Sequence, residues 1–156
     1  MIIGVIGGNK VDTNAWLQAE HIGKFIAAGK HILVCGGLGG VMEAAAKGAK
    51  EKAGLTVGIL PSDSKGAENP YIDVPIATGM SFGRNNIIIN TADILFAIDG
   101  SYGTLTEIAM ALNMKKHVIA INSWKLDNER LTDDFYHPVS DANEAVAVFR
   151  ELNGGI

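Results

Sequence analysis

The chain has 156 residues, of which 47% are hydrophobic, and it carries a formal net charge of −4 at neutral pH. This length suffices for one well-buried core but is short for two, so we expect a single domain over residues 1–156. The 13 basic residues form no dense tract, which argues against nucleic acid and anionic membranes as partners. The lone Cys35, with neither a signal peptide nor an apolar run long enough to span a bilayer, indicates a cytoplasmic protein.

In the first part of the chain, short apolar runs alternate with segments of helical periodicity. This alternation is typical of a parallel sheet covered on both faces. In chain order we predict a strand, a helix, a strand, a helix and a strand at Ile2–Ile6, Asn14–Ala28, His31–Val34, Val41–Ala53 and Leu55–Leu60. Asp12 or Thr13 is placed to cap the first of these helices.

The same alternation continues after a polar loop at residues 61–70. The further predicted strands are Ile72–Ala77, Asp93–Ile98 and His117–Ile121, and the further predicted helices are Gly83–Thr91, Leu105–Asn113 and Asp141–Leu152. Together the elements predict a single Rossmann-like, doubly wound α/β domain. Its mostly parallel sheet would have about six or seven strands, with helices on both faces.

Three glycine-bearing turns follow predicted strands. Their glycines are Gly7 and Gly8, then Gly36, Gly37, Gly39 and Gly40, and finally Gly100 and Gly103. In a doubly wound sheet all three turns would lie at the carboxyl edge, where ligands bind. None forms a GxGxxG or Walker motif, which disfavours a standard NAD site. Each turn alone is explained equally well by tight-turn geometry, but three on one edge favour a ligand.

The third turn leads into a helix, whose free N–H groups and dipole favour an anion such as phosphate. Ser101 and Thr104 lie in this junction, and the ring of Tyr102 is placed to flank a flat ligand. Glu107 has two interpretations: it acts in the site, or it forms an S/T-x-x-E capping box with Thr104. Arg84 likewise either grips a phosphate or carboxylate or forms an ordinary ion pair.

No metal site is expected, because the four histidines lack the spacing of metal ligands.

The segment Asp99–Glu107 resembles the Pro-Gly-Gly-x-Gly-Thr-x-x-Glu turn of the Lonely Guy (LOG) family of Rossmann-like phosphoribohydrolases, once labelled lysine decarboxylases. Gly100, Gly103, Thr104 and Glu107 agree with this turn. The resemblance covers most of the chain and extends to the molybdenum cofactor carrier proteins, which are related to the LOG enzymes.

An upstream segment, Ser81–Asn85, resembles the Met-x-x-Arg-Lys element of the same family, and Arg84 matches its catalytic arginine. Four residues depart from the LOG pattern: Asp99 replaces proline, Ser101 a glycine, Asn85 a lysine and Glu43 a glycine. The departures and the compact length are more similar to the carrier branch. An extra carboxylate at Asp99 would weaken anion binding unless it is turned away.

The resemblance implies two functions. As a binding protein, the chain would hold a phosphorylated small molecule, a nucleotide or the phosphorylated pterin of the molybdenum cofactor, as cargo and with no cofactor required. As an enzyme, it would cleave the N-glycosidic bond of a nucleoside 5′-monophosphate, with Arg84 and Glu107 as catalytic residues. We favour binding. Relatives of this kind assemble as dimers or tetramers, and the apolar run Ile87–Ile89 is a candidate interface.

Overall fold

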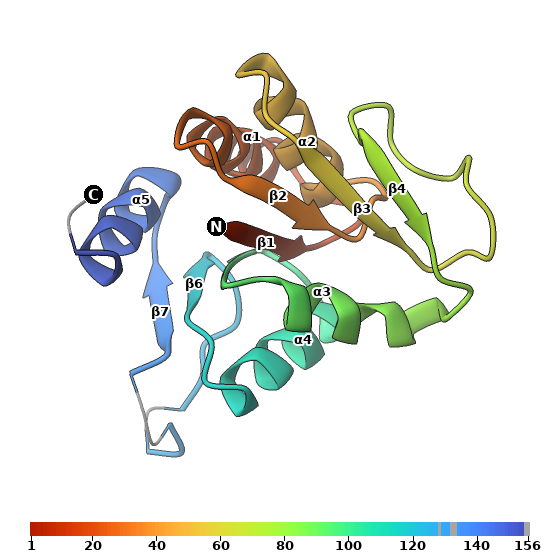
Figure 1. Ribbon diagram of the computed structural model, residues 1–156. Coiled ribbons are helices and arrows are strands. Elements are labelled where there is room, and N and C mark those ends of the chain that lie inside the picture. Colours follow the sequence, from red (N-terminus) through yellow and green to blue (C-terminus); the bar gives the residue numbers. More distant parts are fainter. Residues whose placement is uncertain (128, 132–133, 155–156) are drawn as a thin grey trace.

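The computed structural model describes residues 1–127, 129–131 and 134–154. Its centre is a sheet of seven parallel strands in the order β4-β3-β2-β1-β5-β6-β7 (Figure 1). The strands are β1 (Ile2–Gly7), β2 (Ile32–Cys35), β3 (Thr56–Leu60), β4 (Val74–Ala77), β5 (Ile94–Ile98), β6 (Val118–Ile121) and β7 (Tyr136–Val139). The predicted α/β architecture is confirmed.

Helices cover both faces of the sheet. On one face lie α1 (Thr13–Ala28), α2 (Val41–Glu51) and α5 (Ala142–Leu152), and on the other lie α3 (Asn85–Thr91) and α4 (Tyr102–Asn113) (Figure 1). A short 3₁₀ helix, Ser81–Arg84, leads directly into α3. The side chain of Asp12 accepts a hydrogen bond from the backbone N–H of Ala15 and so caps α1, which decides between the two predicted candidates, Asp12 and Thr13.

Each face of the sheet has its own apolar core. Beneath α1 and α5, the rings of Phe25, Phe96 and Phe149 contact one another. Beneath α3 and α4, Ile88 and Ile89 are fully buried. The expectation that Ile87–Ile89 forms an intermolecular interface is therefore wrong for two of its three residues, because they belong to the chain's own core.

Two differences from the predicted elements are larger than a shift of one or two residues at an element's end. The edge strand β7 was not predicted, because its four residues include His137 and Pro138 and so lack an apolar pattern; an edge strand tolerates proline. Helix α4 begins at Tyr102, three residues before the predicted start at Leu105. Thr104 consequently lies inside the helix, and its predicted capping box with Glu107 is wrong: the N-cap is Ser101, which makes no side-chain capping bond.

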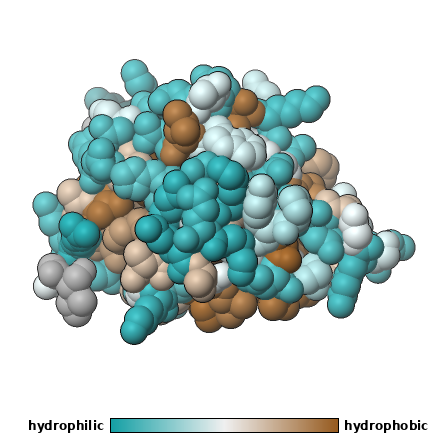
Figure 2. Space-filling model, turned by 90° about the horizontal axis from the view of Figure 1, so that it is seen from above, coloured by the Kyte–Doolittle hydropathy of each residue, from teal (hydrophilic) through white to brown (hydrophobic). Residues whose placement is uncertain are grey.

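The surface seen from above in Figure 2 is covered mainly by hydrophilic side chains, and apolar side chains gather there only in small patches. None of the helices that the structure describes is long and apolar enough to cross a membrane.

Candidate functional site

A cavity of about 220 Å³ lies outside the carboxyl ends of β1 and β5. In the sheet order, β2, β3 and β4 lie on one side of β1, and β5, β6 and β7 lie on the other. This reversal of strand order is the place where open α/β sheets bind their ligands. The cavity is bordered by the turns after β1, β2 and β5 and by the start of α3, so the fold brings the three predicted glycine turns to one edge.

Arg84 forms one wall of the cavity, and only 8% of it is exposed. Its Nε donates to the carbonyl of Ile59 at 2.8 Å, Nη2 donates to the carbonyl of Gly36 at 3.4 Å, and Nη1 donates to the side-chain oxygen of Asn85. A guanidinium has five N–H groups, so these three bonds fix its plane and leave donors for a ligand. Burial lowers the pKa of Arg84, but a guanidinium remains charged at physiological pH.

Gly36 is required for this placement of the arginine. A Cβ atom at Gly36 would lie 2.5 Å from Nη2 of Arg84 and 2.7 Å from the sulfur of Met42. The glycine after β2 therefore makes room for the guanidinium.

Glu107 faces the same cavity from the second turn of α4 and is only 7% exposed. Burial raises the pKa of its carboxyl group to about 7, and the positive charge of Arg84 partly opposes this rise. Among the described residues, neither a hydrogen bond nor an ion pair holds the Glu107 carboxyl group. A cation and an acid whose pKa is raised to about 7 thus border one cavity without forming an ion pair.

The first turn of α4 supplies a third feature, because Ser101, Gly103 and Thr104 line the cavity. The first N–H groups of a helix have no partners inside it and carry the positive end of its dipole. Gly100 has a φ of +101°, and a Cβ there would lie 2.3 Å from the hydroxyl oxygen of Thr104. In contrast, a Cβ at Gly103 would meet nothing within 4 Å, so packing does not explain this glycine.

The structure divides the predicted site residues into two groups. The residues that line the cavity are Gly7, Gly8, Gly36, Arg84, Ser101, Gly103, Thr104 and Glu107. The residues that do not line it are Gly37, Gly39, Gly40, Gly100 and Tyr102. For each residue of either group, contact with a ligand remains a prediction.

Three residues of the second group make contacts outside the cavity. Gly40, with a φ of +61°, comes so close to the turn after β1 that a Cβ would lie 2.2 Å from the carbonyl oxygen of Gly8. The N–H of Gly39 donates to the side chain of Asn9 at 3.0 Å. Tyr102 is 79% exposed, and its ring lies 5.8 Å from that of Trp124.

Several lining residues were not predicted to belong to the site: Val5, Ile6, Asn9, Leu38, Met42, Phe82 and Asn85. Asn9 follows the first glycine pair, so its position in the turn was the available signal. Phe82 is 83% exposed although it is aromatic, which marks it as a surface residue of the cavity's border. The aliphatic residues carry no signal, since strand and helix interiors contain such side chains everywhere.

Asp99 does not line this cavity. Its φ is +51°, and it borders a separate small cavity together with Asp12 and Asn122. The extra carboxylate is therefore not part of the lining of the predicted anion site, although its Oδ2 would lie 3.7 Å from a Cβ placed at Gly8, a residue that does line this cavity.

Cys35, His117 and His137 do not line the cavity. Cys35 is buried, and burial raises its pKa to about 11. His117 Nδ1 and His137 Nε2 lie 2.9 Å apart, a contact between two imidazoles. In the part of the chain that the structure describes, no group of three or more His, Cys, Asp or Glu side chains is placed to hold a metal ion.

A sequence model of the SLOG cluster4 family matches residues 1–150. The chain belongs to the SLOG cluster4 family. It is also 48% identical over 121 residues to a protein of Archaeoglobus fulgidus, an alignment that covers 78% of this chain and 80% of the relative.

Solved structures with similar folds include two proteins of the molybdenum cofactor. The molybdenum cofactor binding protein from Rippkaea orientalis superposes with a TM-score of 0.89 at 32% identity over 97% of this chain and 96% of its own. The molybdenum cofactor carrier protein from Chlamydomonas reinhardtii gives 0.86 at 35% identity over 98% of both chains. The predicted kinship with LOG-like proteins of the carrier branch is confirmed.

A more distant structural relative, DNA processing protein A from Streptococcus pneumoniae, gives a TM-score of 0.70 at 16% identity over 93% of this chain and 60% of its own. At this identity it shows a shared fold only.

Proposed function

We propose that this protein binds a phosphorylated pterin, the organic part of the molybdenum cofactor, in the cavity between β1 and β5. The observation that carries the proposal is the convergence of Arg84, Glu107 and the first turn of α4 on one cavity at the switch point of the sheet. The 32% and 35% identities to molybdenum cofactor proteins over nearly whole chains support this ligand above other phosphorylated molecules.

The chemistry of the cavity fits a phosphate group. The N-terminal N–H groups of α4 and the guanidinium N–H groups of Arg84 that have no protein acceptor are donors of the kind that phosphate oxygens accept from. The exposed ring of Phe82, at the border of the cavity, is better placed to cover a flat ring than Tyr102, which does not line it. In this role the cofactor is cargo, and the chain's residues hold it without transforming it.

One observation favours a second function, hydrolysis of nucleoside 5′-monophosphates. Glu107 faces the cavity unpaired, and its pKa of about 7 suits an acid or base at neutral pH. Arg84 stands in the same cavity, as the LOG-type mechanism requires. Hydrolysis is therefore the competing outcome that the experiment must separate from binding.

The decisive experiment measures what the purified protein carries. We expect protein from cells that synthesise the cofactor to release a phosphorylated pterin on denaturation, quantified by mass spectrometry. Arg84→Lys keeps the charge but loses the guanidinium donors, so its yield should fall severalfold, whereas Arg150→Lys, outside the cavity, should leave it unchanged.

Two results would contradict the carrier function. The first is failure of the protein to retain any phosphorylated pterin. The second is release of free base and ribose 5-phosphate from AMP that disappears in Glu107→Gln, which would establish the hydrolase instead. A cytoplasmic location, a homo-oligomeric state and the absence of nucleic acid among the ligands belong to the same proposal.

A further inference from the structure

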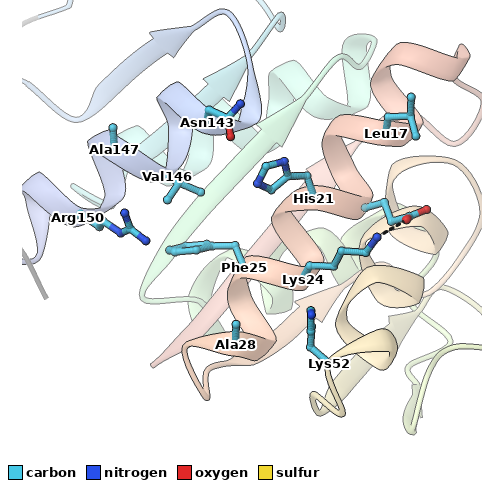
Figure 3. Close-up of a pocket in the computed structure, with 11 residues that line it drawn as sticks. Leu17, His21, Lys24, Phe25, Ala28, Lys52, Asn143, Val146, Ala147 and Arg150 are labelled. Carbon is cyan, nitrogen blue, oxygen red and sulfur yellow. Dashed lines mark hydrogen bonds and ion pairs between the residues drawn. The ribbon is translucent and has the colours of Figure 1, made fainter.

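A groove of about 600 Å³ runs between α1 and α5, on the face of the sheet opposite α3 and α4 (Figure 3). Helix α1 lines it from Leu17 to Ala28, α5 lines it from Asn143 to Arg150, and Lys52 stands beside it just after α2. At 1.5 Å per residue, the α1 wall is about 16 Å long, or three helical turns. None of the groove residues lines the cavity proposed to bind the pterin.

The floor of the groove is apolar and firmly anchored. Phe25 lies between the two helices, with Val146 and Ala147 on the α5 side (Figure 3). The ring of Phe25 packs edge-to-face on Phe149, with 5.1 Å between ring centroids, so the floor rests directly on the core. At one end Leu17 is 57% exposed, which is high for a large apolar side chain on a helix.

The rim of the groove is cationic. The ammonium group of Lys24 is neutralised by Glu20 at 2.7 Å and by Glu51 at 2.9 Å. Lys52 and Arg150 have no carboxylate partner among the residues that the structure describes, and both side chains reach toward the groove (Figure 3). These two cations give the groove a local excess of positive charge, although the whole chain has a net charge of −4. This local excess favours an acidic occupant.

We infer that this groove binds an acidic, amphipathic helix of a partner protein. An apolar floor between two helices accepts the apolar stripe of a third helix, at positions i, i+3, i+4 and i+7. Carboxylates beside that stripe would meet Lys52 and Arg150. Nucleic acid fits less well, because an acidic chain with two free cations in the groove neutralises few phosphates.

A designed peptide tests this inference directly. The probe is a fluorescein-labelled peptide of about 14 residues, roughly 21 Å of helix, with leucine at the stripe positions and glutamate elsewhere. Fluorescence anisotropy should show binding that weakens as salt is added. The combined change Lys52→Glu and Arg150→Glu should lower the affinity by about tenfold or more, and so should Ala147→Glu, which puts a carboxylate on the floor.

A matched control, Lys115→Glu with Lys125→Glu, reverses the charge of two exposed lysines outside the groove. It should change the affinity for the peptide by less than about twofold. Four results would overturn the inference. Two of them concern the peptides: no binding of the glutamate peptide, or equal binding of a peptide with lysine in place of glutamate. The third is tighter binding of a single-stranded oligonucleotide at the same salt. The fourth is an oligomer whose mass by light scattering falls to that of a monomer when the charges of Lys52 and Arg150 are reversed. The last result would place a second copy of this chain in the groove.

Discussion

At the scale of single residues, the cavity depends on two opposite charges that do not pair. Arg84 is occupied by backbone carbonyls and Asn85, and Glu107 is left without a partner among the described residues. A buried acid with a raised pKa costs stability at neutral pH, since it must give up either its charge or its hydration. Such a cost is typical of groups kept for binding or catalysis.

The proton on Glu107 should therefore be linked to the ligand. A phosphate beside the carboxyl group disfavours its ionised form, so binding takes up a proton, and affinity should fall as the pH rises through about 7. Above that pH the affinity should drop by up to about tenfold per pH unit. Isothermal titration with AMP between pH 6 and pH 8 measures the effect.

Glu107→Gln is the control for this prediction, because it keeps a hydrogen-bond donor in place and removes the titration. The phosphate's own ionisation is the same for both proteins and cancels in the comparison. A wild-type pH dependence identical to that of the variant would show that Glu107 does not exchange its proton on binding.

At the scale of elements, the short helix α3 is held at its end by one lysine. The ammonium group of Lys116 donates to the carbonyls of Ile89, Asn90 and Ala92 at 2.7, 2.8 and 2.6 Å. These are carbonyls that the helix leaves without internal partners. The helix held in this way begins directly after Arg84.

Lys116→Met should lower the free energy of unfolding by about 2 kcal/mol, because it leaves these carbonyls without their charged donor. Chemical denaturation measures the loss. The neighbouring Lys115→Met changes an exposed side chain with no hydrogen bond among the described residues, and its effect should stay within about 0.5 kcal/mol. Equal effects of the two substitutions would disprove the capping role.

The first turn of α4 should show a conflict between stability and binding. Gly103→Ala should stabilise the helix by about 0.5 kcal/mol, since alanine has the higher helix propensity and its Cβ meets nothing within 4 Å. The same methyl group should weaken pterin or AMP binding, because Gly103 lines the cavity. Thermal unfolding and ligand titration on one sample measure both effects, with Asn113→Ala at the far end of α4 as the control. A variant that binds like the wild type would remove Gly103 from the site.

The predicted elements succeeded where a pattern extends over many residues and failed where single residues decide. The apolar runs of β1 and β5 and the cap at Asp12 were evident, because burial on both faces and capping leave local signals. The start of α4 was misplaced because Thr104 and Glu107 satisfy a capping pattern that tertiary structure overrides. Strand β7 was missed because its register is set by β6 and not by its own residues.

At the scale of the whole molecule, a candidate site could be outlined from the sequence, but the residues that line the cavity could not all be predicted. The rule that ligands bind at the carboxyl edge brings the glycine turns together, and the resemblance to the LOG family pairs Arg84 with Glu107. The contribution of Phe82 and the direction of Asp99 depend on how loops pack, which no local pattern records. The same holds for the groove between α1 and α5, whose residues come from elements more than a hundred residues apart.

Two glutamates should make the stability of the fold depend on pH in opposite directions. Glu107 has a folded pKa of about 7, above its ordinary value, so the stability tied to its proton is complete at low pH and is lost as the pH rises through 7. Glu20 is salt-bridged to Lys24 and Lys47, which hold its pKa at about 2, so its contribution is complete above its ordinary pKa and is lost as the pH falls toward 2. His31 titrates in both variants and cancels in differences from the wild type.

At pH 8, Glu107→Gln should therefore have a free energy of unfolding higher than that of the wild type by on the order of 2 kcal/mol, and it should unfold at a higher temperature. Near pH 5 the two proteins should unfold at the same temperature. Glu20→Gln should do the reverse, with a lower unfolding temperature at pH 7 that converges on the wild type as the pH falls toward about 2. Calorimetry across this range measures both differences. A stabilisation by Glu107→Gln that is equal at pH 5 and pH 8 would mean that packing, and not the buried charge, separates the two proteins, and the case for a proton-exchanging acid in the cavity would fail with it.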